Sequence, residues 1–229
     1  MKSLATRSVA PSDSAMMAYR TLVGVGLCCA VLMVTVHQLA GPRIAANRAH
    51  ALGSAVLAVL PGALESRAYR LNEQGAFRTL GESEDAAAPG EERVFAGYDE
   101  QGQLVGVALE AAAMGYQDTI RLLYGYAPAR RQIVGMRVLE SRETPGLGDR
   151  IEKDASFLQS FLALDVSLAA DGTLLNPIGV LASGRKPQPG QIDVITGATV
   201  SSRAVATALR ESTGRWVALV SSRLEDFRK

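Results

Sequence analysis

The longest apolar run in the chain lies near its start. Residues 21–40, TLVGVGLCCAVLMVTVHQLA, contain no Asp, Glu, Lys or Arg, and a helix of about 20 such residues crosses the apolar core of a bilayer. A helix buried in a soluble protein would show a polar face, but no polar stripe precedes His37. A cleaved signal peptide would need a small residue where Gln38 stands. The pattern therefore predicts an uncleaved transmembrane helix.

The region after this helix changes from helical spacing to a polar texture. Residues 43–60 carry Ala and Leu at helical intervals, and Pro61 and Gly62 end the pattern. Residues 63–92 are polar and rich in Gly, Ala and Glu, which is typical of a loop or a poorly packed insertion. A long domain after a single apolar helix is translocated largely regardless of its charge. The charges that flank the helix therefore do not fix its orientation. We expect the N-terminus to be cytoplasmic, the helix to lie in the inner membrane, and the following domain to be periplasmic. The expected division is a short cytoplasmic N-terminus (1–20), a transmembrane helix (21–40), a helical stalk (41–62) and an exported domain (63–229).

From residue 93 onward, short β-rich runs alternate with Gly, Asp and Pro. The runs VFAGYDE, QLVGVALE, TIRLLYGYA and QIVGMRVLE have the period-two alternation of strands, and the last two flank a hairpin at 127–130. Residues 156–164 favour a short helix and 183–190 a loop. Residues 200–224 predict a long helix with one apolar stripe that would pack on a sheet. The predicted fold class is α+β: a single N-terminal transmembrane helix followed by a mostly antiparallel sheet domain with packed helices.

Composition excludes several kinds of function. The 24 basic and 23 acidic residues nearly balance, and no basic cluster interleaved with aromatic residues indicates a nucleic-acid partner. The two cysteines, Cys28 and Cys29, lie inside the apolar run, so the exported part has no cysteine for a zinc site or an iron–sulfur cluster. With only His37 and His50 as histidines, we expect no metal site. Any redox role must come from an organic cofactor.

The stretch DVITGATVSS concentrates hydroxyl groups between a strand-like run and the long helix. A strand that ends in a glycine turn and opens a helix forms an anion site, because the first helical amides have no intrahelical acceptor and the helix dipole adds positive charge. Ordinary N-capping by one hydroxyl is the alternative. The stretch lacks the lysine of a phosphate-binding P-loop and the repeated glycines of a dinucleotide fingerprint. The hydroxyl-bearing residues are Thr196, Thr199, Ser201 and Ser202.

Two segments carry a resemblance to a known family. Asp193 to Thr199, DVITGAT, matches the pattern D-x-x-[ST]-G-A-T, and Glu143 to Gly148, ETPGLG, matches a second segment of the same family. Both are found in FMN-binding domains whose flavin is covalently attached. The chain resembles most closely the G subunits of Rnf-type electron-transport complexes, which are related to the C subunits of sodium-translocating NADH:quinone reductases. The resemblance is strongest over residues 115–152 and 191–210.

The resemblance implies a role for each residue of the two segments. Thr199 would bear FMN through a phosphoester, and a flavin transferase that uses FAD as donor would make this bond. Asp193 would belong to the recognition sequence of that transferase, although an Asp before a turn is also a common turn former. The expected neighbours of the phosphate are Thr196, Gly197, Ala198, Ser201 and Ser202. The expected wall beside the flavin ring is Glu143, Thr144, Pro145, Gly146, Leu147 and Gly148.

The implied function is an electron relay. FMN exchanges one or two electrons, and the chain shows no paired acid and base, no nucleophile triad and hence no expected catalytic residue of its own. The resemblance implies a subunit of an ion-translocating complex linked to NADH and ferredoxin, with the other subunits, the flavin transferase and membrane lipid as partners. Whether the chain counts as an enzyme stays open. The alternatives are an anchored flavoprotein with a regulatory or reductase role, and a non-redox anchored binding module.

Overall fold

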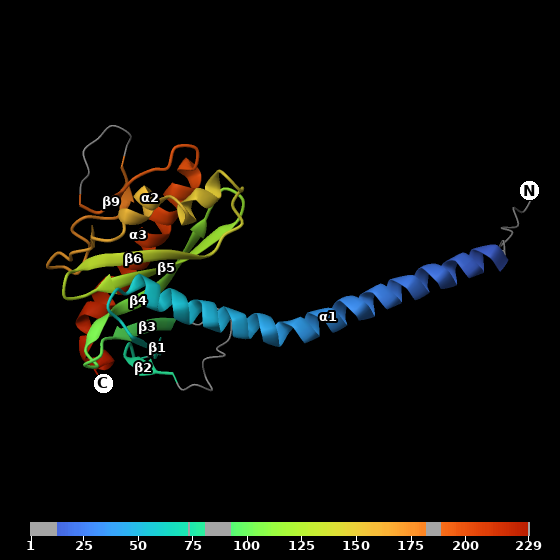
Figure 1. Cartoon of the computed structure of the whole chain (residues 1–229), viewed down its shortest axis with the longest axis horizontal. Helices are drawn as coiled ribbons and strands as arrows, with labels where there is room; N and C mark the ends of the chain where they lie inside the picture. Colours follow the sequence, from blue (N-terminus) through green and yellow to red (C-terminus); the bar gives the residue numbers. More distant parts are fainter. Residues whose placement is uncertain (1–12, 73, 81–92, 182–188, 229) are drawn as a thin grey trace, which may run out of the picture. The chain divides into compact units, whose positions relative to one another are not determined.

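The computed structural model describes residues 13–72, 74–80, 93–181 and 189–228. The chain divides into two compact units, Met1–His50 and Ala51–Lys229. The first unit consists, where it is described, of part of helix α1, which spans Asp13–Val59. The second unit contains the last turns of α1 and all of the strands (Figure 1).

Helix α1 is the one helix in the described part of the chain that is long and apolar enough to cross a membrane. Its apolar side chains from Met16 to Ile44 are exposed, as a lipid-facing surface requires. The hydroxyls of Thr21 and Thr35 donate to the carbonyl oxygens four residues earlier, each at 2.7 Å. Such bonds satisfy polar groups inside the helix, where lipid offers no partner. The prediction of a single N-terminal apolar helix is confirmed.

A seven-stranded antiparallel sheet forms the centre of the second unit, in the order β2-β1-β3-β4-β5-β6-β7. Its strands are β1 Glu65–Leu71, β2 Phe77–Thr79, β3 Arg93–Tyr98, β4 Leu104–Met114, β5 Thr119–Ala127, β6 Gln132–Glu140 and β7 Leu164–Asp165. A separate parallel pair joins β8 Gly179–Val180 to β9 Gln191–Ile192. The helices after α1 are η1 Gly148–Glu152, α2 Ala155–Gln159, α3 Thr199–Ser222 and η2 Leu224–Phe227. The predicted α+β class, with its mostly antiparallel sheet, is confirmed.

Two of the predicted segments differ from the structure. The sequence of the polar region 63–92 favours a loop or a poorly packed insertion, but its described part contains β1 and β2. β2 is an edge strand and β1 lies next to it. Both bury few side chains, among them Tyr69 and Phe77, so their apolar signal is weak. The helix expected over 156–164 ends at Gln159. The loop expected over 183–190 lies mostly outside the described residues.

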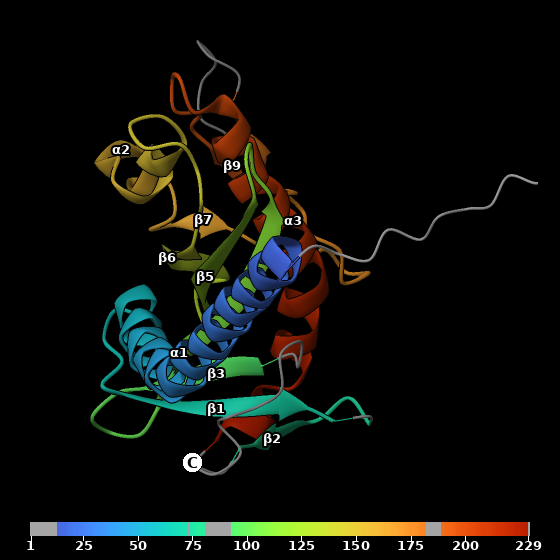
Figure 2. The same cartoon turned by 90° about the vertical axis from the view of Figure 1, so that its right-hand side faces the viewer.

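The central strands bury both faces of the sheet. In β5, Leu122, Tyr124 and Tyr126 belong to the larger apolar core, whereas Leu123 and Ala127 belong to a smaller cluster on the opposite face. Helix α3 covers the larger core, and the last turns of α1 cover the smaller cluster (Figures 1 and 2). This assignment follows from the period-two geometry of a strand, which sends successive side chains to opposite faces.

A row of glycines brings the end of α1 close to the sheet. A Cβ on Gly125 would overlap the carbonyl oxygen of Val59, and one on Gly106 would lie 2.8 Å from a methyl group of Leu60. These distances are shorter than real Cβ contacts allow, so only glycine fits. We call the four residues the glycine trough; it comprises Gly97, Gly106, Gly125 and Gly135, one from each of β3 to β6.

The glycine trough changes the expected domain boundary. We expected the stalk to extend to residue 62, but the compact unit begins at Ala51. Val56, Val59 and Leu60 are fully buried against the sheet. Residues 51–60 are therefore part of the folded domain, because their apolar side chains complete one face of its core.

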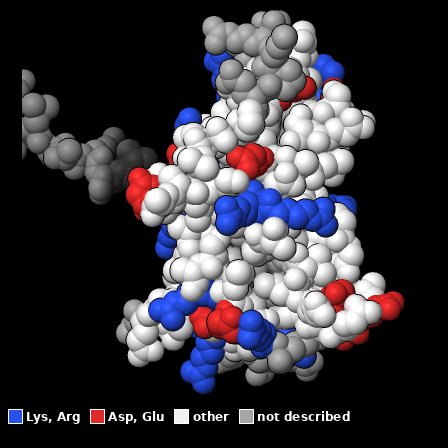
Figure 3. All heavy atoms as spheres, turned by 90° about the vertical axis from the view of Figure 1, so that its left-hand side faces the viewer, with Lys and Arg blue, Asp and Glu red and all other residues white. Residues whose placement is uncertain are grey.

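Charges of both signs share the surface of this unit. On the face drawn in Figure 3, basic side chains form a row across the middle, and acidic side chains lie above and below it. This mixture agrees with the near balance of 24 basic and 23 acidic residues.

We predict that Gly125→Ala destabilises the protein by about 1 to 3 kcal/mol, because the new methyl group must displace the backbone of α1 from the trough. Thermal or urea unfolding of the full chain in detergent measures the change. The matched control is Gly214→Ala in α3, where a Cβ meets nothing within 4 Å; there the substitution should stabilise by about 0.5 to 1 kcal/mol. Equal stability of the two variants would contradict the close fit at the trough.

Candidate functional site

The strand β9 leads into α3 through a tight turn. The amide of Ala198 donates to the carbonyl oxygen of Ile195 at 2.9 Å, and Gly197, the third residue of this turn, has φ +88°. A residue with a side chain would be strained at that angle, which is why type II turns place Gly there. The glycine of the TGAT segment is thus explained by the backbone turn itself.

The N-terminus of α3 has no side-chain cap. Its N-cap residue, Ala198, makes no capping hydrogen bond, and the first helical bond runs from the amide of Ser202 to the carbonyl oxygen of Ala198 at 2.9 Å. Within the described residues, no acceptor is found for the amides of Thr199, Val200 and Ser201. Ordinary N-capping is therefore not the reason for the hydroxyl-rich sequence. The arrangement leaves backbone donors at the positive end of the helix dipole without a partner in the described structure.

The four hydroxyl groups divide into two inward and two outward ones. Ser202 is buried; its hydroxyl donates to the carbonyl oxygen of Ala198 at 2.9 Å and accepts from the amide of Ile195 at 3.2 Å. Ser201 is also buried and donates to Glu143. Thr196 and Thr199 are exposed. All four were expected near a phosphate, but the two serines are turned toward other partners, and the threonines alone present their side chains at the surface.

The second motif also forms a glycine turn. The amide of Leu147 donates to the carbonyl oxygen of Thr144 at 3.1 Å, and Gly146 has φ +80° at the third position, after Pro145 at the second. This is the turn that Pro followed by Gly favours. Leu147, at the tip of this turn, is 53% exposed, whereas Gly148 is buried. Leu147 and Pro145, which is also exposed, therefore offer apolar side chains to the surface.

Glu143 lies inside the protein and joins three segments. It is only 6% exposed. Its Oε1 accepts from the amides of Tyr116 and Gln117, at 2.9 and 3.1 Å, and its Oε2 accepts from the hydroxyl of Ser201. The carboxylate thus connects the β4–β5 turn, the 143–148 segment and the first turn of α3. The structure brings the two sequence motifs together at this one side chain.

Arg150 supplies a cation that the sequence did not indicate. Its Nη1 donates to the carbonyl oxygen of Thr196 at 2.7 Å, and its Nη2 donates to Asp154 at 3.1 Å. The hydroxyl of Ser156 and the amide of Phe157, together with Arg150, hold the pKa of Asp154 below its usual value, so this carboxylate remains an anchor for the guanidinium at neutral pH. Because 46 residues separate Arg150 from Thr196, only the fold could reveal the contact.

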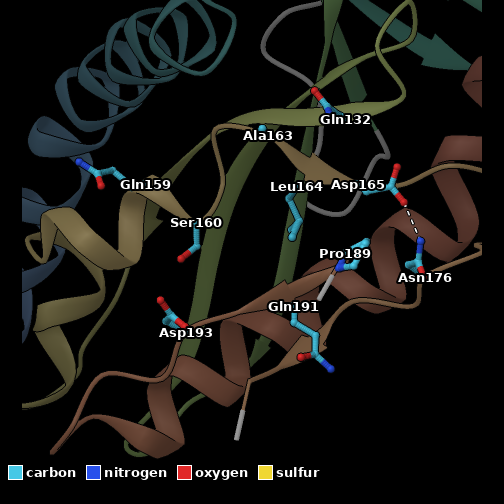
Figure 4. Close-up of a pocket in the computed structure, with 11 residues that line it drawn as sticks. Gln132, Gln159, Ser160, Ala163, Leu164, Asp165, Asn176, Pro189, Gln191 and Asp193 are labelled. Carbon is cyan, nitrogen blue, oxygen red and sulfur yellow. Dashed lines mark hydrogen bonds between the residues drawn. The ribbon is translucent and has the colours of Figure 1, made fainter. Parts of the chain in front are cut away.

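Asp193 lies on the rim of two surface pockets beside the turn. The larger, of about 710 Å³, has both polar and apolar walls and lies between α2, β7 and the β8–β9 pair (Figure 4). The smaller, of about 230 Å³, also contains Arg150 and Thr196. Asp193 is exposed and makes no hydrogen bond that would stabilise the turn within the part of the chain that the structure describes. Its carboxylate is therefore free to face another molecule.

Comparison with known families matches residues 115–213 to the FMN-binding domain. This range contains both motifs, the glycine turns and Glu143. Two solved structures share the fold. The crystal structure of Shewanella oneidensis NqrC has a TM-score of 0.59 and 17% identity, covering 80% of this chain and 96% of that one. The C subunit of the Na(+)-translocating NADH-quinone reductase from Parabacteroides distasonis has a TM-score of 0.54 and 21% identity, covering 70% and 79%.

Curated relatives extend the match over nearly the whole chain. The G subunit of the ion-translocating oxidoreductase complex from Pseudomonas aeruginosa strain UCBPP-PA14 is 33% identical over 214 residues, covering 91% of this chain and 89% of the relative. The corresponding G subunit from Methanosarcina acetivorans is 35% identical over 121 residues, covering 52% and 55%. The chain therefore belongs to the family of G subunits of ion-translocating oxidoreductase complexes.

Proposed function

We propose that the chain is the electron-relay subunit of a membrane-bound, ion-translocating oxidoreductase and carries FMN joined covalently to Thr199. The observation that carries the proposal is the uncapped start of α3, where an exposed threonine stands beside amides without acceptors in the described structure. Membership of the G-subunit family and the match to the FMN-binding domain support the class of cofactor and the class of complex.

The residues present fit the phosphate of FMN. The first amides of α3 have no acceptor among the described residues, and the helix dipole favours an anion there. Gly197 leaves the turn without a side chain, and Thr196 adds an exposed hydroxyl. Arg150, fixed on the carbonyl oxygen of Thr196, adds positive charge at the same edge. The flavin, when bound, supplies exchange of one or two electrons; the protein supplies attachment and placement.

The attachment reaction proposed here balances without an added oxidant. The Oγ of Thr199 attacks the FMN-side phosphorus of FAD, the new Oγ–P bond forms, and the bond from that phosphorus to the AMP half breaks, so AMP leaves. The hydroxyl proton passes to the transferase. The chain gains the mass of one FMN less one water. Asp193, exposed on the rim of both pockets beside the turn, is the residue that we assign to recognition by the transferase.

The proposed location follows from the single candidate span. Helix α1 would cross the inner membrane once, with residues 1–20 in the cytoplasm and the flavin domain in the periplasm. A tethered cofactor suits that compartment, because a lost flavin could not readily be replaced there. The proposed partners are the other subunits of the complex, the flavin transferase and membrane lipid.

We predict that Thr199→Ala removes covalent flavin while the domain still folds, because the exposed hydroxyl makes no hydrogen bond within the described structure. Intact-mass measurement of protein from a host with the transferase should show one FMN less one water on the wild type and the bare chain for the variant. Thr196→Ala is the matched control and should keep at least part of the flavin. A wild-type chain of unmodified mass would contradict the attachment.

We predict that Asp193→Asn slows flavin attachment several-fold without altering thermal stability, because its side chain supports no described bond in the fold. The fraction of flavin-bearing chains, followed by in-gel fluorescence after a pulse of transferase expression, measures the rate. Unchanged kinetics would remove Asp193 from the recognition sequence.

We predict that protease added to intact spheroplasts degrades the domain after α1 but spares a tag at the N-terminus. Immunoblotting against tags at both ends reads the result, and permeabilised cells, in which both tags become accessible, provide the control. Protection of the C-terminal tag in intact spheroplasts would reverse the proposed orientation.

A further inference from the structure

We propose that Glu143 and Ser201 form a positioning pair: Glu143 does not touch the flavin but fixes the first turn of α3 against the 143–148 segment and the β4–β5 turn. This inference rests on the proposed attachment at Thr199 and assigns a function to two residues that sequence reasoning had placed beside the cofactor.

Burial gives the first argument. Both carboxylate oxygens of Glu143 lie inside the protein and accept hydrogen bonds from the chain itself: Oε1 from the amides of Tyr116 and Gln117, and Oε2 from Ser201. Hydrogen bonds to a charged group are about twice as strong as neutral ones, so these contacts hold the carboxylate firmly. Because the carboxylate is buried, a cofactor at the surface would meet the backbone and side chains around Glu143 first.

Two glycines give the second argument. A Cβ on Gly115 would lie 2.5 Å from Oε1 of Glu143, and a Cβ on Gly148 would lie 2.5 Å from Oε2 and 2.8 Å from the Oγ of Ser201. Neither residue has a positive φ that would call for glycine. Glycine at these positions is thus explained by the close approach of backbone to the carboxylate. The final glycine of ETPGLG makes room for Glu143 and not for a flavin ring.

Helix geometry gives the third argument. Successive helical residues are rotated by about 100°, so residues two apart point in roughly opposite directions. Ser201 follows Thr199 by two positions. When Glu143 holds Ser201 inward, the side chain of Thr199 is directed outward. The exposure of Thr199 in the structure agrees with this direction. The pair therefore sets the direction of the attachment residue and, through the 143–148 segment, the placement of Leu147.

The test separates a positioning residue from a flavin ligand by three substitutions. In Glu143→Gln, the amide oxygen still accepts from Tyr116 and Gln117, and the amide nitrogen donates to the oxygen of Ser201, so shape and contacts persist while the charge is lost. Glu143→Ala and Ser201→Ala each break the pair. Ser212→Ala is the matched control: it removes a hydroxyl on the same helix that bonds Tyr124 at 2.9 Å, outside the pair.

Two measurements on the full chain in detergent read the result. The first is the native absorption and fluorescence of the attached flavin, with the denatured gel band as the measure of total flavin. The second is hydrogen exchange of the peptides that contain residues 115–117 and 143–148, made in the Thr199→Ala background so that it does not depend on flavin. Loss of one such hydrogen bond to a charged group should raise local opening about tenfold or more.

We expect Ser201→Ala and Glu143→Ala to speed exchange in both peptides and to change the native flavin spectrum, with Glu143→Gln and Ser212→Ala close to wild type. The proposal is overturned if Glu143→Gln changes the spectrum while Ser201→Ala does not, because the carboxylate would then act on the flavin directly. It is also overturned if Ser201→Ala leaves exchange unchanged. A wild-type band without flavin overturns the proposed function alone, since the exchange measurement still decides the pair.

Discussion

The central strands of this protein carry apolar side chains on both faces, so the sheet is stable only when both are covered. Helix α3 covers one face, and the last turns of α1 cover the other. This requirement explains the glycine trough, since the second cover consists of a short helix end that must lie close to the strands to bury enough surface. It also fixes the start of α3 at one end of the sheet, where the two sequence motifs meet.

The site uses the same helix for two purposes. The buried face of α3 is held by its apolar side chains and by hydroxyl pairs such as Tyr126 with Ser221, at 2.9 Å. Its first turn faces outward with Thr199 and with amides that have no acceptor among the described residues. A helix fixed so firmly along its length can leave its N-terminus without a cap, because tertiary packing supplies the stability that capping would otherwise add.

Local patterns predicted the parts of the fold that depend on neighbours in sequence. The short β-rich runs of β3 to β6 and the apolar stripe of α3 were sufficient, because these strands and one face of the helix are buried. The edge strand β2 and its neighbour β1 were missed because they bury few side chains. The glycine trough could not be predicted, since Gly97, Gly106 and Gly125 become neighbours only when the strands pair.

The motifs identified the candidate site but not the structural role of each residue in it. TGATVSS supplies four hydroxyl groups, and no local rule tells which turn inward; Ser201 and Ser202 face the interior because of Glu143 and the Ile195 backbone. Arg150 was not selected for the same reason, as its partner lies in a distant segment. The contacts in the folded chain show which side chains lie together. The resemblance to FMN-binding domains supplied the cofactor chemistry, which these contacts alone do not identify.

The packing of Val59 and Leu60 against the glycines of the trough has a practical consequence for where the domain begins. A fragment that begins after Pro61 would lack the helix that covers one face of the sheet. The apolar surface at the glycine trough would then be exposed across four strands, and such a surface is prone to self-association. A water-soluble fragment of this protein should therefore begin after the apolar run that ends at residue 40 and no later than Ala51. The last two to three turns of α1 are therefore not a flexible linker but a structural part of the domain that follows them.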